Sequence, residues 1–196
     1  MKNVALAKKK QIKNTLTGWG MIAEETLWHP TDVKNRKFDL YVSSDGMLFK
    51  KQLSRARSRL HSKLEVEYNA LKVVKELNLP HFQVLIEGNI SDNISYIITE
   101  YCGVRITAQR VPKDFKSQLN IIQCGLDTLK DHKVYHNDVH INNILVHESK
   151  LTLIDFDMST TDKPRNWSVS KQHKFSNCQS IIDKINDKWG YNNILG

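Results

Sequence analysis

The sequence predicts an α+β protein in which short antiparallel strands come mostly before amphipathic helices. Two apolar runs, at 38–42 and 47–53, flank the turn Ser43-Ser44-Asp45-Gly46, and this pattern is typical of a β-hairpin. Apolar residues also recur at helical spacing in three later segments, at 62–77, 115–129 and 181–189. A chain of 196 residues can bury one good core, or two small lobes that share a cleft.

The composition is that of a soluble globular chain, with 40% hydrophobic and 26% charged residues. No apolar run approaches the roughly 20 residues that a membrane span requires, and the basic start of the chain has no apolar signal-peptide region. We therefore expect an intracellular, cytoplasmic protein without a signal peptide or transmembrane segment. Three cysteines, Cys102, Cys124 and Cys178, lack zinc-site spacing and are expected to be reduced core thiols.

Positive charge is concentrated in the first part of the chain. Residues 1–75 hold 16 Lys or Arg against 7 Asp or Glu, and so carry the whole net excess of +8. Residues 1–17 predict a solvated basic arm, and Arg55, Arg57 and Arg59 form a basic run that leads into the first helix. An anionic partner such as nucleic acid would meet this part of the chain. A nucleic-acid contact surface is therefore one interpretation of the chain, although a weak one.

The strands around the hairpin are less sharply defined. Further strands are predicted at 21–27, 82–87 and 94–101. Either Gly18 with Gly20, or the glycine-free segment 29–37, is expected to cover a bound phosphate group. In the second case the side chains of Lys34, Arg36 and Lys37 would replace close backbone contacts with charge.

The most informative stretch is polar and lies between the second and third helices. Asp138 is followed by Asn143 five residues later, and Asp155 follows the apolar run 151–154. A carboxylate that orients an acceptor hydroxyl, together with two oxygen ligands for a metal, is what a Mg-nucleotide site requires. The plainer alternative is that His136, Asp138 and Asn143 brace a turn, but bracing would not require Asp155.

This motif, H-x-D-x-x-x-x-N with a downstream Asp-Phe, resembles the protein-kinase-like superfamily. The resemblance implies a two-lobed fold, with a small antiparallel N-terminal sheet plus one helix and a mainly helical C-terminal lobe. Two departures, His140 two residues after Asp138 and Asp157 in place of the usual glycine after Asp-Phe, are similar to aminoglycoside and choline kinase-like enzymes. Asp157 should also make the loop less able to flip than a glycine would.

The resemblance implies roles for residues throughout the chain. Asp138 would be the catalytic base, Asn143 and Asp155 the Mg²⁺ ligands, and backbone groups around Glu100 and Cys102 would bind the adenine of ATP. Alternation along the second hairpin strand puts Leu48, Lys50 and Gln52 on one face, so Lys50 is expected to hold the phosphates and Lys51 to face the other way.

Glu67 lies within the apolar stripe of the first helix and requires a partner, for which Lys50 is the natural candidate. The alternatives are an exposed lysine pair on an edge strand and a helix glutamate that reaches water.

The resemblance also divides the chain, with an N-lobe at 18–101 and a truncated C-lobe at 102–196 that together form one kinase-like domain. Only one helix is predicted after Asp157, which is similar to minimal kinases such as the RIO and KEOPS-type kinases. The implied function is an ATP- and Mg²⁺-dependent phosphotransferase that acts on a protein or small-molecule hydroxyl. The alternative is an inactive nucleotide-binding module on the same scaffold, favoured by the missing glycine loop and substrate helices.

Overall fold

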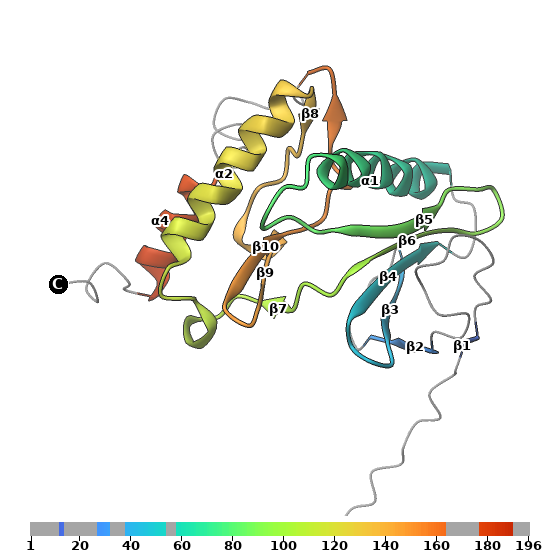
Figure 1. The fold of residues 1–196 in the computed structure, drawn as a ribbon, viewed down its shortest axis with the longest axis horizontal. Coiled ribbons are helices and arrows are strands. Elements are labelled where there is room, and N and C mark those ends of the chain that lie inside the picture. Colours follow the sequence, from blue (N-terminus) through green and yellow to red (C-terminus); the bar gives the residue numbers. More distant parts are fainter. Residues whose placement is uncertain (1–11, 14–26, 32–37, 54–57, 164–176, 190–196) are drawn as a thin grey trace, which may run out of the picture.

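The structure is a computed structural model that describes residues 12–13, 27–31, 38–53, 58–163 and 177–189. In these residues, six strands form an antiparallel sheet in the order β1-β2-β3-β4-β6-β5 (Figure 1). The bounds of these strands are β1 Ile12–Lys13, β2 Leu27–Pro30, β3 Asp39–Ser43, β4 Leu48–Leu53, β5 Leu85–Asn89 and β6 Ser95–Glu100.

The hairpin is confirmed, because β3 pairs with β4 across the turn at 43–46. Gly46 has a φ of 74°, a conformation that glycine adopts without steric cost. The side chain of Asp45 accepts a hydrogen bond from the backbone N–H of Met47 at 3.0 Å, which closes the turn locally.

The strand predicted at 21–27 continues beyond Leu27 in the structure. The prediction placed it at 21–27 and left His29 and Pro30 in a loop, but both residues belong to β2, which pairs with β3. Residues 18–20, 21–26 and 32–37 lie outside the described residues, so the expected covering segments are not decided by the structure. The same is true of the basic arm, apart from the short strand β1, and of Arg55 and Arg57.

One long helix, α1 (Ser58–Glu76), runs alongside the sheet (Figure 1). Its predicted apolar stripe is confirmed, since Leu64, Leu71 and Val74 are buried. Glu67 lies in the same stripe and is 1% exposed. The helix therefore turns one carboxylate towards the inside of the protein together with its apolar face.

The remaining elements follow β6 and build the second half of the molecule. Helix α2 (Phe115–Asp131) buries the five predicted residues Phe115, Leu119, Ile122, Leu126 and Leu129. Beside it lie a three-stranded sheet, in the order β10-β9-β7, and the pair β11-β8. Their bounds are β7 Val104–Arg105, β8 Val134–Tyr135, β9 Ile144–His147, β10 Lys150–Leu153 and β11 Thr160–Thr161.

A last helix, α4 (Gln179–Trp189), lies on the α2 side of the molecule (Figure 1). Its buried Ile181 and Ile185 belong to the same core as the buried residues of α2. That core is one cluster of buried side chains, which also includes residues of α1 and of β6. The two halves are further joined by a bridge between Phe82 and Leu153. The α+β architecture is the one that the sequence predicts.

The expectation for the cysteines is only partly correct. All three thiols are free, but only Cys178 is buried, whereas Cys124 is exposed and Cys102 is partly exposed. In the described part of the chain, no helix is long and apolar enough to cross a membrane.

Candidate active site

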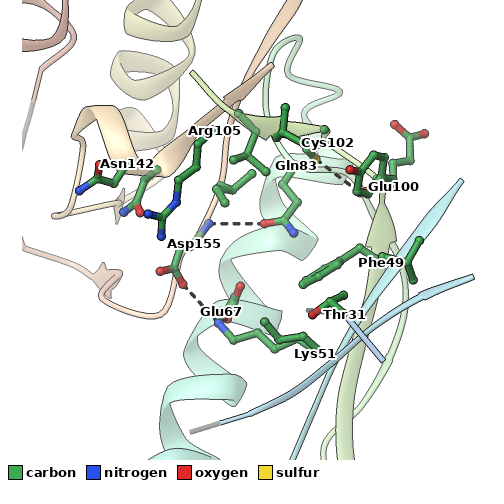
Figure 2. A pocket seen from close by; sticks show the side chains of 18 of the residues that line it. Thr31, Phe49, Lys51, Glu67, Gln83, Glu100, Cys102, Arg105, Asn142 and Asp155 are labelled. Carbon is green, nitrogen blue, oxygen red and sulfur yellow. Dashed lines mark hydrogen bonds and ion pairs between the residues drawn. The ribbon is translucent and has the colours of Figure 1, made fainter. Parts of the chain in front are cut away.

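A cavity of about 820 Å³ lies between the six-stranded sheet and the segments around β9 (Figure 2). This volume is in the range of pockets that bind small molecules and cofactors. Its lining includes Glu100, Cys102, Asn143 and Asp155, all of which are site residues predicted from the sequence. It also includes Glu67 and, from β4, Lys51.

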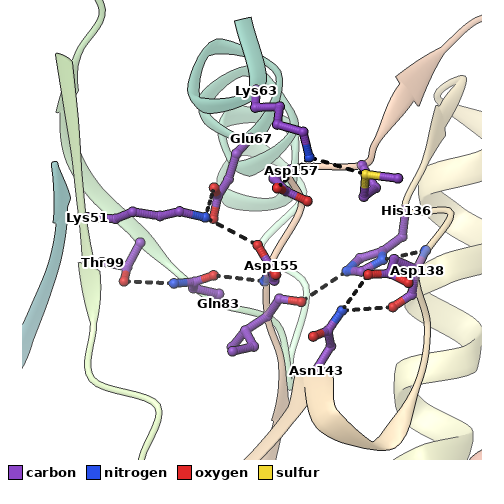
Figure 3. A network of polar contacts seen from close by, with 12 residues as sticks. Lys51, Lys63, Glu67, Gln83, Thr99, His136, Asp138, Asn143, Asp155 and Asp157 are labelled. Atoms are coloured by element: carbon purple, nitrogen blue, oxygen red, sulfur yellow. Dashed lines mark hydrogen bonds and ion pairs between the residues drawn. The ribbon is translucent and has the colours of Figure 1, made fainter. Parts of the chain in front are cut away.

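The lysine that reaches this cavity is Lys51, and the prediction of Lys50 is wrong. The Nζ atom of Lys51 lies 2.6 Å from Oε2 of Glu67 and 3.2 Å from Oδ1 of Asp155 (Figure 3). Lys50 is also buried, but its ammonium lies on the opposite face of β4, 5.6 Å from the ring centre of Trp28 and 4.9 Å from that of Tyr96.

The physical reason is that the Lys51 face of β4 is the one that meets Glu67 of α1. Lys51 shares its face with Phe49 and Leu53, and Leu53 belongs to the hydrophobic core. The face of Lys50 carries Leu48 and Gln52 instead. The alternation along the strand does not by itself choose between these two faces.

The ion pair is buried at both ends. Burial alone would lower the pKa of Lys51, but the carboxylates of Glu67 and Asp155 outweigh it and raise that pKa above its usual value. Burial also raises the pKa of Glu67, and the ammonium 2.6 Å away opposes this shift. The shared proton stays on Lys51, because an ammonium between two carboxylates is strongly favoured over a neutral amine.

Asp138, His140 and Asn143 form a hydrogen-bonded cluster in the loop that precedes β9. The amide nitrogen of Asn143 donates to Oδ2 of Asp138 at 3.1 Å and to its backbone oxygen at 3.0 Å. Nε2 of His140 lies 3.4 Å from Oδ1 of Asp138, while its Nδ1 accepts from the backbone N–H of Asn142. Burial opposes ionisation of Asp138, yet the hydrogen bonds from His140 and Asn143 bring its pKa below the usual value.

The residues around the cluster brace it. His136 is 2% exposed; its Nδ1 accepts from the N–H of Asp138 and its Nε2 lies 3.2 Å from the backbone oxygen of Ile154. These two bonds fix the neutral tautomer, with the proton on Nε2. Burial lowers the pKa of His136 to about 4. The turn-bracing alternative is thus correct for His136, which links the Asp138 loop to the strand before Asp155.

The donor set at Asn143 and Asp155 fits a magnesium ion. The amide nitrogen of Asn143 is committed to Asp138, which turns its carbonyl oxygen away from Asp138 (Figure 3). Lys51 contacts only Oδ1 of Asp155, whose side chain is 38% exposed. A carboxylate and an amide oxygen are hard ligands of the kind Mg²⁺ prefers, with water and phosphate oxygens completing its shell. Among the described residues, no group of three His, Cys, Asp or Glu forms a separate metal cluster.

The segment after β6 forms one edge of the cavity. The N–H of Tyr101 donates to the oxygen of Met47, whereas neither the N–H nor the C=O of Cys102 bonds to another backbone group of the described residues. Gly103 follows with a φ of 94°, and a Cβ there would lie 2.1 Å from the backbone oxygen of Val146. Only glycine lets the chain pass this close to β9, so the cavity edge has a fixed shape.

Two cavity residues were missed by the sequence analysis. Gln83 is 5% exposed and donates from Nε2 to Oγ1 of Thr99 at 3.0 Å, and its Oε1 lies 3.5 Å from the backbone N of Asp155 (Figure 3). Arg105 extends into the cavity from β7 on the side of Asn142 (Figure 2). A single polar residue within the apolar stretch 82–86 was the available signal for Gln83, while nothing local distinguishes Arg105.

Comparison with solved structures places this architecture among kinases. The chain is similar to the kinase PK-1 of Cydia pomonella granulovirus, with a TM-score of 0.52 and 19% sequence identity. The similarity covers 63% of this chain and 48% of the viral chain, so the match spans about half the length of that kinase. No family model matches the sequence, and no curated protein matches it. The protein has a kinase-like fold.

Proposed function

We propose that this kinase-like protein is an ATP- and Mg²⁺-dependent phosphotransferase that acts on a hydroxyl acceptor. The observation that carries the proposal is that one cavity is lined both by Asn143, whose amide is hydrogen-bonded to Asp138, and by the ion-paired Lys51, Glu67 and Asp155. These groups come from four separate segments of the chain. A braced turn would require only the hydrogen bonds around Asp138. A stable core would require neither those hydrogen bonds nor the ion pairs of Lys51.

In this proposal each group has a separate task. Lys51, held by Glu67, binds the phosphates of ATP, and backbone groups of Glu100 and Cys102 bind the adenine. Asn143 and Asp155 hold Mg²⁺, which when bound supplies positive charge against the β- and γ-phosphates. The domain is divided as the sequence suggests, with an N-lobe at 18–101 and a C-lobe at 102–196.

Asp138 is the proposed general base. Its lowered pKa keeps it ionised at neutral pH, so it can accept the proton of the acceptor hydroxyl. The acceptor oxygen then forms a bond to the γ-phosphorus as the bond to the β-phosphate oxygen breaks, and ADP leaves. His140 and Asn143 orient the carboxylate through their contacts with its two oxygens. The acceptor is a protein or a small-molecule hydroxyl.

A second candidate is a nucleotide-binding module without turnover. It is favoured by the absence of glycine from residues 29–37, three of which, His29, Pro30 and Thr31, line the cavity. Without glycine, backbone amides approach phosphate less closely, which weakens transition-state stabilisation more than simple binding.

Asp138→Asn separates the two candidates. The amide keeps the size of the side chain and most of its hydrogen bonding but cannot take the proton, so phosphate transfer or ATP hydrolysis should fall on the order of 10²-fold or more. Affinity for Mg-ATP should stay close to that of the parent, because Asp138 is assigned no contact with nucleotide or metal. The measurements are turnover of labelled ATP with candidate acceptors and titration of a fluorescent ATP analogue.

The exposed Asp131→Asn on α2 is the matched control for loss of one carboxylate, and thermal melting checks the folding of both variants. If the parent binds Mg-ATP but shows no turnover that depends on Asp138 with any acceptor, the second candidate replaces the first.

A further inference from the structure

Helix α1 contacts the loop that carries Asp155 at two points, and the proposed function uses only one. Lys63 and Glu67 are four residues apart, so they lie on the same face of the helix. Glu67 reaches Asp155 through Lys51. One turn earlier, Nζ of Lys63 lies 2.9 Å from Oδ2 of Asp157 and 3.4 Å from Sδ of Met158 (Figure 3).

The Lys63–Asp157 pair is largely shielded from water. The exposed fractions of the two side chains are 24% and 11%, and attraction between charges is stronger here than between fully exposed ions. Asp157 stands in place of the usual, more flexible glycine after Asp-Phe. The ion pair thus fastens the loop to α1 at the position where it would otherwise be free to turn.

The other side of the same segment is held by Asn137. Its amide nitrogen donates to the backbone oxygen of Met158 at 3.1 Å and to Oγ1 of Thr160 at 2.8 Å. Strand β11 then pairs with β8 in the register Thr160 to Tyr135. Residues 157–161 are therefore held between α1 on one side and the Asp138 loop on the other.

The backbone adopts a costly conformation at Asn137 itself and at Asp155, just before the Asp157 attachment. Asp155 and Asn137 both have a positive φ, at 67° and 62°. Such conformations persist only where surrounding contacts enforce them. Phe156, which is fully buried against His136 and Phe82, supplies one such contact, and the Lys63–Asp157 pair supplies the next along the chain.

We propose that Lys63 is a positioning residue that, through Asp157, holds segment 155–161 against α1 and so keeps the Asp155 carboxylate directed into the cavity. Its effect on turnover rests on the proposed function, whereas its effect on the segment does not.

Hydrogen exchange tests the structural part. In Lys63→Met, two amides should exchange on the order of tenfold faster than in the parent: that of Ser159, bonded to the oxygen of Phe156, and that of Asp162, bonded to the oxygen of Lys133. Lys72→Met is the control, because Lys72 is an exposed lysine on the same helix whose ammonium lies over the ring of Tyr68. Unchanged exchange in Lys63→Met would overturn the proposal.

Charge variants and kinetics test the role itself. Lys63→Arg should keep the parent's exchange rates, Asp157→Asn should reproduce the effect of Lys63→Met, and the double variant should add little to either. With Mg-ATP, kcat should be about tenfold lower in Lys63→Met than in the parent. In Lys63→Arg, kcat should stay close to that of the parent. Faster exchange with unchanged kcat would contradict the positioning role. If the parent has no turnover, the proposed function fails, and the exchange and affinity for Mg²⁺-nucleotide still decide the role of Lys63.

Discussion

Single residues decide the electrostatics of the cavity. Lys50 and Lys51 are adjacent and both buried, yet only Lys51 has carboxylate partners within ion-pair distance. Burial among aromatic rings lowers the pKa of Lys50 to about 8, with Glu87 opposing the shift. The ammonium of Lys51 is paired, whereas that of Lys50 is mainly desolvated. Removal of the charge should therefore destabilise the protein at Lys51 but not at Lys50.

We predict that Lys51→Met lowers turnover by on the order of 10²-fold and also lowers the melting temperature, because Glu67 is left buried without its partner. Lys50→Met should keep turnover within about threefold of the parent, since Met replaces a desolvated ammonium with an apolar side chain of similar length. Steady-state kinetics and thermal melting of the two variants test this. Equal loss of turnover in both would contradict the assignment of the phosphate-binding lysine to Lys51.

At the scale of elements, the packing of α2 against the segment before β5 leaves no spare room. A Cβ at Gly125 would lie 2.4 Å from Cε2 of Phe82, and the ring of Phe82 is itself 2% exposed. Phe82 also pairs with Leu153 and contacts Phe156. The close approach of α2 thus supports the strand that leads into Asp155.

Gly125→Ala should therefore destabilise the protein by about 1–3 kcal/mol, the usual cost of overpacking, although alanine in an open helix position is about 1 kcal/mol more favourable than glycine. Urea unfolding measures the change. Asn120→Ala, on the exposed side of α2, is the control and should be neutral or slightly stabilising. Stabilisation by Gly125→Ala would show that the ring of Phe82 gives way at little cost.

The two halves of the molecule share one core, so local protonation changes the stability of the whole. His136 lies inside this junction, and burial lowers its pKa from 6.5 to about 4. The unfolded chain therefore binds a proton at this residue between pH 6.5 and 4, where the folded protein does not. Stability that is fully present above pH 6.5 is lost as the pH falls to 4.

The expected loss is on the order of 3 kcal/mol, since each unit of pKa shift corresponds to about 1.4 kcal/mol. Free energies of unfolding measured in urea at pH 7, 6, 5 and 4 should show it. The dependence of the unfolding free energy on pH should be shallower in His136→Gln than in the parent. It should be unchanged in His132→Gln, which alters an exposed histidine at the end of α2. A parent-like slope in His136→Gln would contradict the assignment to His136.

The α+β class, the hairpin, the apolar stripes of the helices and the Asp138, Asn143, Asp155 motif were predictable from the sequence. Each depends on spacing along a short segment, which the periodicity of helices and strands translates directly into a face or a loop. Element boundaries were less accurate, as β2 shows, because the residues that end a strand are chosen by its pairing partner.

Only the tertiary structure decided which face of β4 meets α1, and hence that Lys51 rather than Lys50 is the partner of Glu67. The two-residue repeat of a β-strand means that adjacent lysines point in opposite directions. It does not specify which face of the strand the rest of the protein covers. The same holds for the pair of Lys63 and Asp157, which are 94 residues apart. Contacts at that separation arise from the packing of whole elements, and no local pattern in the chain specifies them.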